Sequence, residues 1–146
     1  MHAIKSAAAI LGLTAFALAG CGSESAMSGK TTMKATLSAA QEVPATASQG
    51  SGTGTFNYDP TTKLLQYSVS YSGLTGPATA AHIHGPAAMG ANAGVMVPFQ
   101  NVASSPITGS ATLNADQEKA LLSGQTYVNV HTAAHPGGEI RGQIVK

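Results

Sequence analysis

The chain has 146 residues, of which 9% are charged and 5% aromatic, and its formal net charge is +1. This length fits one domain of ordinary size. So small a charge gives no field for phosphates, which argues against nucleic-acid binding, and the low charged fraction argues against long surface helices. The single cysteine excludes a disulfide framework and a cysteine-rich zinc site.

The first 20 residues have the pattern of an export signal. Lys5 precedes an apolar run over residues 7–19 that is too short for a comfortable transmembrane helix. The run ends in Leu18-Ala19-Gly20-Cys21, which resembles the lipobox of bacterial lipoproteins. That resemblance implies removal of residues 1–20 and lipidation of the Cys21 thiol. The alternative is an ordinary secreted protein with a stray cysteine, but the single cysteine falls at the one position that a lipobox requires.

Residues 21–33 are rich in Ser, Gly and Thr, which is typical of a flexible tether between a lipid anchor and a domain. Gly22, and not Asp, follows the cysteine, and the resemblance to sorted lipoproteins then favours the outer membrane in an organism that has one. We therefore expect a chain that lipid holds at the cell envelope, with its domain facing the periplasm.

From residue 34 onward the pattern is a succession of short strands. Leu65, Tyr67, Val69 and Tyr71 alternate with polar residues, which is the period of a half-buried strand. Asp59-Pro60-Thr61-Thr62 is a turn signal in front of that strand. Strands are expected over residues 33–38, 54–58, 64–71, 80–84, 94–99, 107–113, 126–132 and 139–145. These eight strands predict an all-β domain over residues 34–146, an antiparallel β-sandwich or Greek-key barrel.

One short helix is expected before the last two strands. Asn114 is a suitable N-cap, Asp116 and Glu118 follow where the helix dipole favours acids, and Gly124 provides a C-terminal stop. We expect a two-turn connector with no function of its own. Alternation within the strands also predicts a core that contains Tyr67, Val69, Ile83, Val128, Val130 and Ile144.

The histidines of the predicted domain fall in two pairs, which are His82 with His84 and His131 with His135. Alternate residues of a strand share a face, so His82 and His84 present both imidazoles on one side. Val128 and Val130 face the core and thereby turn His131 outward. His135 lies in the following turn and reaches the others only if that turn folds back. Imidazoles that converge on one outward face, with no thiolate, suit copper(II) or zinc, and copper binds more tightly.

A simpler interpretation is that these histidines are solvated surface residues, because a His-Xaa-His pattern is weak by itself. In the same way, Glu139 and Arg141 could form a surface ion pair worth about 0–1 kcal/mol. The two interpretations differ in geometry. Histidines that share a metal at about 2 Å should place their ring nitrogens within about 4 Å of one another.

Three segments of the chain resemble the CHRD domain, a family first named from chordin and common in bacterial exported proteins. They are an opening at residues 35–44, a central stretch at 74–87 that contains His82-Ile83-His84-Gly85-Pro86, and a C-terminal stretch at 127–144 that contains His131 and Glu139-Ile140-Arg141-Gly142. The resemblance covers about residues 34–145. It implies the fold of that family and a site, and it implies no defined activity.

A fainter likeness is to copper-zinc superoxide dismutases, in which a Leu-Thr-Xaa-Pro turn also leads into His-Xaa-His and a late Val-Xaa-Val-His strand follows. That likeness implies His82, His84 and His131 as copper ligands, with His135 as a fourth candidate, and Arg141 as a guide for the superoxide anion. The chain has no counterpart of the bridging histidine, the zinc loop or the disulfide cysteines. The likeness therefore implies at most a copper-only site, with dismutase-like activity as one option.

We thus expect a lipid-anchored, copper-binding domain of the cell envelope, with copper sequestration, copper delivery or superoxide chemistry as its role. The alternative, from a different class, is a structural or interaction module that binds a protein or a glycan and uses no metal. Ser, His and Asp residues are present, but no motif assembles them for hydrolysis.

Overall fold

The computed structural model describes residues 29–146. The predicted signal peptide (1–20), Cys21 and residues 22–28 of the predicted tether lie outside the described residues. The strands are β1 (Thr31–Ser38), β2 (Ser51–Asp59), β3 (Leu64–Ser72), β4 (Ala78–His84), β5 (Val95–Pro98), β6 (Ile107–Thr112), β7 (Tyr127–Thr132) and β8 (Ile140–Gln143). A 3-10 turn, η1 (Ala39–Gln41), follows β1, and the helix α1 (Ala115–Leu122) lies between β6 and β7.

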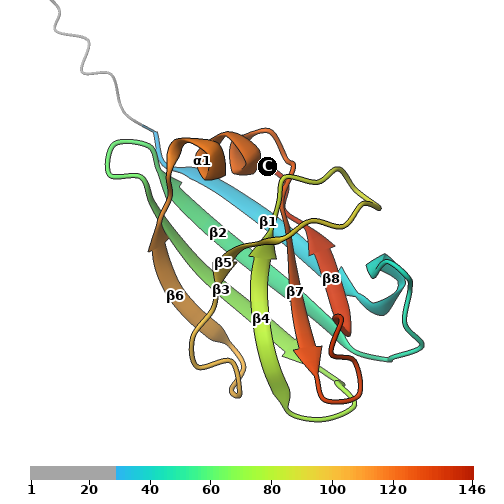
Figure 1. The fold of residues 1–146 in the computed structure, drawn as a ribbon. Coiled ribbons are helices and arrows are strands. Elements are labelled where there is room, and N and C mark those ends of the chain that lie inside the picture. The colour runs from blue at the N-terminus through green and yellow to red at the C-terminus, as the bar shows by residue number, and fades with distance from the viewer. Residues whose placement is uncertain (1–28) are drawn as a thin grey trace, which may run out of the picture.

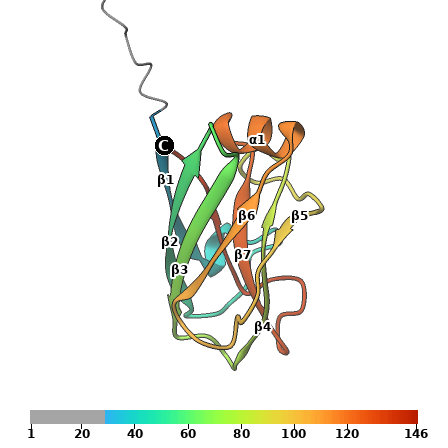
Figure 2. The ribbon, with the colours of Figure 1, turned by 90° about the vertical axis from the view of Figure 1, so that its left-hand side faces the viewer.

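All eight strands pair antiparallel in one sheet, in the order β5-β4-β7-β8-β1-β2-β3-β6. Figures 1 and 2 show this sheet folded over into two facing layers, with β4 and β7 in one layer, β1, β2 and β3 in the other, and α1 across one end. The prediction of an eight-stranded antiparallel sandwich or barrel with one short helix is confirmed. No helix in the described range is long and apolar enough to span a membrane.

Local signals place the elements where the sequence predicts them. In the β2–β3 turn, Oδ1 of Asp59 accepts a hydrogen bond from the Thr61 amide at 2.9 Å. At the start of α1, Asn114 and Gln117 form a capping box, in which each side-chain oxygen accepts from the other residue's amide at 2.9 Å. Gly124 follows the helix with a φ of 72°, a left-handed conformation that favours glycine.

The apolar core fills the space between the two layers. All six residues that alternation predicts for the core are buried, namely Tyr67, Val69, Ile83, Val128, Val130 and Ile144. Met33 is also fully buried, and Thr31 and Thr32 pair with β2. The sheet therefore begins at Thr31, and the last residues of the predicted tether belong to β1, because they continue its pairing and supply a core side chain.

The main departure from the prediction is that β7 and β8 are buried on both faces. Their inner face packs in the core. Their outer face lies under the β4–β5 segment (residues 85–94), which Figure 1 shows in olive beside them, and under the loop after η1. Gln143 donates to the Ala87 carbonyl at 3.0 Å, and Asn92 of the segment donates to the Val43 carbonyl at 2.9 Å. A covered polar layer thus replaces the solvent-facing surface that alternation predicts.

Glu139 shows how this covering is anchored. Its side chain is fully buried, and its carboxylate accepts hydrogen bonds from Ser48, from the amide and hydroxyl of Thr75 and from Thr132, at 2.5–2.8 Å. It therefore joins the loop before β2, the loop before β4 and the β7–β8 turn. The surface ion pair with Arg141, which is one interpretation of the sequence, does not form, because both side chains are buried and each is held by other partners.

We predict that Glu139→Gln lowers the free energy of unfolding by roughly 2–4 kcal/mol, because a buried carboxylate acceptor is replaced by an amide that cannot accept from all three partners. Chemical denaturation at pH 7 measures this loss. Asp116→Asn is the control, since Asp116 is exposed on α1 and its acid-to-amide change should cost less than about 1 kcal/mol. Equal losses in the two variants would contradict the role given to Glu139.

The stability difference between the wild type and Glu139→Gln should depend on pH. Burial opposes ionisation of Glu139, but the hydrogen bonds from Ser48, Thr132 and Thr75 outweigh it and hold the pKa at about 2, below the usual 4.5. Because the folded-state pKa is lowered, the stabilisation is complete above about pH 4.5 and is lost as the pH falls toward 2. The difference in stability between the wild type and Glu139→Gln should shrink over that interval.

Candidate metal centre

The pairing of β4 with β7 brings three of the four predicted histidines together. His82 on β4 lies opposite Asn129 on β7, and His131 on β7 lies opposite Ala80 on β4. His82, His84 and His131 are a group whose ligand nitrogens all lie within 4.8 Å of one another. Nδ1 of His82 and Nε2 of His131 are 3.1 Å apart, which meets the geometry expected of two nitrogens on one ion. The two strands are neighbours, as the convergence of the histidines requires.

The group is less exposed than the sequence predicts. His84 and His131 are each only 8% exposed, whereas His82 is partly exposed at the rim. The three histidines lie on the outer face of the sheet, as strand alternation predicts, but the β4–β5 segment covers this face. The expectation of outward, solvated imidazoles is therefore corrected, and solvent reaches the group from the side of His82.

Two backbone carbonyls fix the tautomers of the buried imidazoles. Nδ1 of His84 donates to the Ala93 carbonyl at 3.0 Å, and Nδ1 of His131 donates to the Pro136 carbonyl at 2.9 Å. A carbonyl oxygen only accepts, so both Nδ1 atoms carry the proton. In the neutral rings both Nε2 atoms therefore hold a free lone pair, which is the arrangement that outer hydrogen bonds impose on metal-binding histidines.

Asn129 lies between the two lone pairs. Its Oδ1 is 3.0 Å from Nε2 of His84 and 2.9 Å from Nε2 of His131. Either imidazole could donate to this oxygen only as a cation, with a proton on both nitrogens. Burial, together with the neighbouring His84, lowers the pKa of His131, although its bond to Pro136 acts in the opposite direction. With the amide oxygen in this position, electron-pair donors converge here. The one neighbouring group that can donate a proton to them is His82, whose Nδ1 lies 3.1 Å from Nε2 of His131. A cation fits the same space.

The surroundings of His82 also disfavour its charged form. Burial lowers the pKa of His82, and the charges of His131 and His84 lower it further. Neutral imidazole is the form that binds a metal. The residues present thus fit a nitrogen-bound metal ion in donor type and tautomer. The His82–His131 separation meets the expected limit of about 4 Å, and the whole group spans up to 4.8 Å.

Arg141 lies in the same covered layer but does not face the histidine group as an open charge. It is 1% exposed, and its guanidinium carbon lies 3.4 Å from the centre of the Tyr127 ring. Its nitrogens donate to Asn92 at 3.0 Å and to the Ala91 carbonyl at 2.6 Å. Tyr127 in turn stacks on His84, with ring centres 4.9 Å apart and planes 2° from parallel. The structure thus places Arg141 behind a ligand ring as a support.

His135 stays apart from the group. Its carbonyl accepts from the Gly138 amide at 3.1 Å, and its amide donates to the Thr132 carbonyl at the same distance. These bonds close a tight β7–β8 turn, and the group of three histidines in the described residues does not include His135. Its side chain instead lines a separate pocket of about 260 Å³ with Glu42 and Pro44.

Three further residues of this layer were not predicted as site residues. Asn129 and Tyr127 occupy the outward positions two and four residues before His131, so strand alternation could have found them. Glu42 comes from the loop after η1 and has no such signal. It is 7% exposed, its Oε1 has no hydrogen-bond partner, and burial raises its pKa to about 7 against the opposing charge of Arg141.

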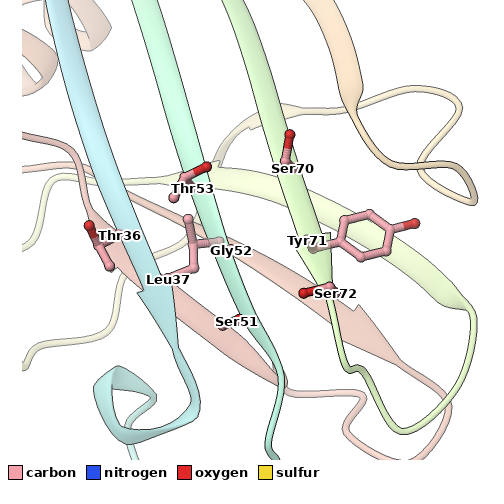
Figure 3. A pocket seen from close by; sticks show the side chains of 8 residues that line it. All are labelled: Thr36, Leu37, Ser51, Gly52, Thr53, Ser70, Tyr71 and Ser72. Carbon is pink, nitrogen blue, oxygen red and sulfur yellow. The ribbon is translucent and has the colours of Figure 1, made fainter.

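A larger pocket, of about 450 Å³, lies away from the histidines at one end of β1, β2 and β3. Figure 3 shows hydroxyl side chains around it, among them Thr36, Thr53 and Ser70. Its lining contains no His, Cys, Asp or Glu. It therefore offers no metal ligand or acid–base pair, and the histidine group is the better candidate for chemistry.

Comparison with known proteins identifies the family of this chain. A family model described as the CHRD domain matches residues 33–144, which include all three grouped histidines and every strand except the first two residues of β1. No curated protein and no solved structure gives a match. The match spans well over half of the chain, and the chain therefore belongs to the CHRD domain family.

Proposed function

We propose that this CHRD domain binds one copper ion through Nδ1 of His82, Nε2 of His84 and Nε2 of His131. The observation that carries the proposal is the convergence of these nitrogens while the Ala93 and Pro136 carbonyls keep two of them unprotonated. The separation of up to 4.8 Å slightly exceeds the span of about 4 Å that one ion allows, so the rings need only a small movement to close on it.

Copper is favoured over other divalent ions by the donor set. The three proposed ligands are imidazoles, and the group contains no carboxylate or thiolate. Nitrogen sites bind Cu(II) more tightly than Zn(II), which is the second choice. Three neutral imidazoles also suit Cu(I), so the site is compatible with both oxidation states of copper.

The alternative of solvated surface histidines fits the geometry less well. Two of the three rings are 8% exposed, and their outer nitrogens are held by backbone carbonyls. Ordering and desolvating these polar rings costs free energy. Binding of an ion would offset that cost. Histidines with no role beyond contact with solvent would have no need of such burial and ordering.

The role that this geometry supports is copper handling, either sequestration or delivery, at the cell envelope. Superoxide chemistry gains no support from Arg141, because its guanidinium is covered and its nitrogens are occupied by Asn92 and Ala91. We further propose that lipid on Cys21 holds the domain at the outer membrane, facing the periplasm.

We predict that the full chain, purified without a His-tag, binds one Cu(II) and that His131→Ala weakens the binding by more than about 100-fold. Loss of a ligand should exceed the roughly 10–100-fold effect of outer partners. His135→Ala is the matched control, since His135 lies outside the group, and its affinity should equal that of the wild type. Titration against a calibrated copper chelator measures all three. Equal, weak binding by all three would reject the metal site and favour a protein- or glycan-binding module.

We also predict the pH dependence of this binding. Protons compete with copper for the ring nitrogens, and burial lowers the pKa of His82 and of His131 below the usual 6.5. Copper affinity should therefore stay constant from pH 8 to about 6.5 and fall only at lower pH. Titrations between pH 4 and 8 test this, and a loss of affinity that begins above pH 6.5 would contradict it.

The proposed anchor has its own test. Cys21→Ser should abolish lipid modification and move the protein from the membrane to the soluble fraction, because a hydroxyl does not replace the thiol as the lipid acceptor. Cell fractionation and mass spectrometry of the mature chain measure both effects. Ser23→Ala is the control, because it changes a hydroxyl residue near Cys21 and keeps the thiol, and this variant should stay lipidated and membrane-bound. A Cys21→Ser protein that stays membrane-bound and is processed normally would overturn the proposal.

A further inference from the structure

We infer that Oδ1 of Asn129 is the fourth donor of the site, and that it completes a planar set of three nitrogens and one oxygen that selects Cu(II). This inference rests on the proposed copper site. It adds a fourth ligand that makes the site prefer Cu(II) to Cu(I). It assigns to Asn129 the place that the sequence suggested for His135.

The donor atoms form a connected series. Nδ1 of His82 is 3.1 Å from Nε2 of His131, which is 2.9 Å from Oδ1 of Asn129. That oxygen is in turn 3.0 Å from Nε2 of His84. Neighbouring donors at the corners of a square, with bonds of about 2.0–2.2 Å, lie about 2.8–3.1 Å apart, whereas tetrahedral neighbours lie about 3.3–3.6 Å apart. Three edges of such a square are thus present, and Cu(II) prefers the square arrangement. The fourth edge, between His82 and His84, lies within the 4.8 Å span of the group and would shorten when the ion binds.

The amide of Asn129 is held with its oxygen toward the histidines. Its Nδ2 lies on the opposite side, next to Oε1 of Glu42 and above Gly138. A Cβ at residue 138 would stand 2.7 Å from that Nδ2 and 2.5 Å from that Oε1, so only glycine leaves room for both. Oε1 of Glu42 is a buried acceptor that lacks a hydrogen-bond partner. When Glu42 is ionised, an amide nitrogen turned toward its carboxylate is favourable, whereas the reversed amide would set two acceptor oxygens against each other.

Backbone register supports the same placement. Asn129 lies between His82 on β4 and Arg141 on β8 in one row across the sheet. Both neighbouring strands therefore hold its main chain, and it is 3% exposed. A donor on a central strand is positioned more precisely than a side chain in the β7–β8 turn.

The test compares copper binding by Asn129→Ala, Asn129→Asp and the control Gln143→Ala, each in the full chain. Gln143 is a buried amide of the same outer face, and it bonds to Ala87 and Gly124 instead of the histidines. Electron paramagnetic resonance of the Cu(II) form reports the equatorial donors. Competition titrations measure Cu(II) and Cu(I) affinities separately, and thermal unfolding shows whether each variant is folded.

We expect Asn129→Ala to change the Cu(II) spectrum and to lower Cu(II) affinity at least 10-fold, with Cu(I) affinity within about 2-fold of the wild type, because three imidazoles suffice for Cu(I). Gln143→Ala should change neither. Asn129→Asp keeps an oxygen donor and adds charge, so it should raise Cu(II) affinity relative to Cu(I) at least 10-fold. If Asn129→Ala does not fold, the ratio of Cu(II) to Cu(I) affinity in Asn129→Asp tests whether Asn129 is a ligand.

An unchanged Cu(II) spectrum in folded Asn129→Ala, or an unchanged affinity ratio in Asn129→Asp, would overturn the inference. Asn129 would then only donate to the two Nε2 atoms in the metal-free protein, with its amide reversed. Both results leave the copper site itself intact. A wild-type chain that binds no copper in these titrations would instead reject the proposed function, and the fourth ligand with it.

Discussion

The candidate site depends on the register between β4, β7 and β8. That register aligns His82, Asn129 and Arg141 in one row on the outer face of the sheet. A slip of one residue would turn every one of these side chains into the core, because strand residues alternate between faces. Burial of Val128 and Val130 on the inner face opposes such a slip. The buried carboxylate of Glu139 adds a second restraint, since it ties the β7–β8 turn to the loop before β4.

The β4–β5 segment both covers the outer face and sets its chemistry. Its Ala93 carbonyl fixes the tautomer of His84, while its Ala91 carbonyl and Asn92 side chain hold Arg141. The Arg141 guanidinium then packs on Tyr127, which stacks on His84. The face of the Tyr127 ring attracts the positive charge of Arg141. The β4–β5 segment thus orients the imidazole of His84 in two ways, directly through the Ala93 carbonyl and indirectly through Arg141 and Tyr127. Such support from neighbouring residues is what holds a side chain precisely on a rigid strand.

Local pattern predicts the fold well, because alternation, turn residues and caps act over a few positions. It also predicts the faces of His82, His84 and His131, which follow from apolar neighbours such as Ile83 and Val130. It does not predict that these faces are covered, since the covering comes from segments that are remote in sequence. For the same reason Arg141 and Glu139 are buried where a polar residue on a strand suggests exposure. His135 is held away by hydrogen bonds within its turn, and an amide such as Asn129 carries no ligand motif.

A buried polar layer is not the arrangement that stability alone would favour. Well-packed apolar side chains often replace buried polar networks without loss, and an unsatisfied acceptor costs about 1–3 kcal/mol. Here the lone pairs of two Nε2 atoms face the oxygen of Asn129, and Oε1 of Glu42 has no partner. These acceptors are grouped on one side of the sheet around a space bounded by imidazole nitrogens. A cation satisfies the nitrogens and Asn129 together, and this leaves the amide of Asn129 free to satisfy Glu42. The layer therefore groups its electron-pair donors where the proposed copper ion would bind, and this grouping is what the proposal explains beyond the fold itself.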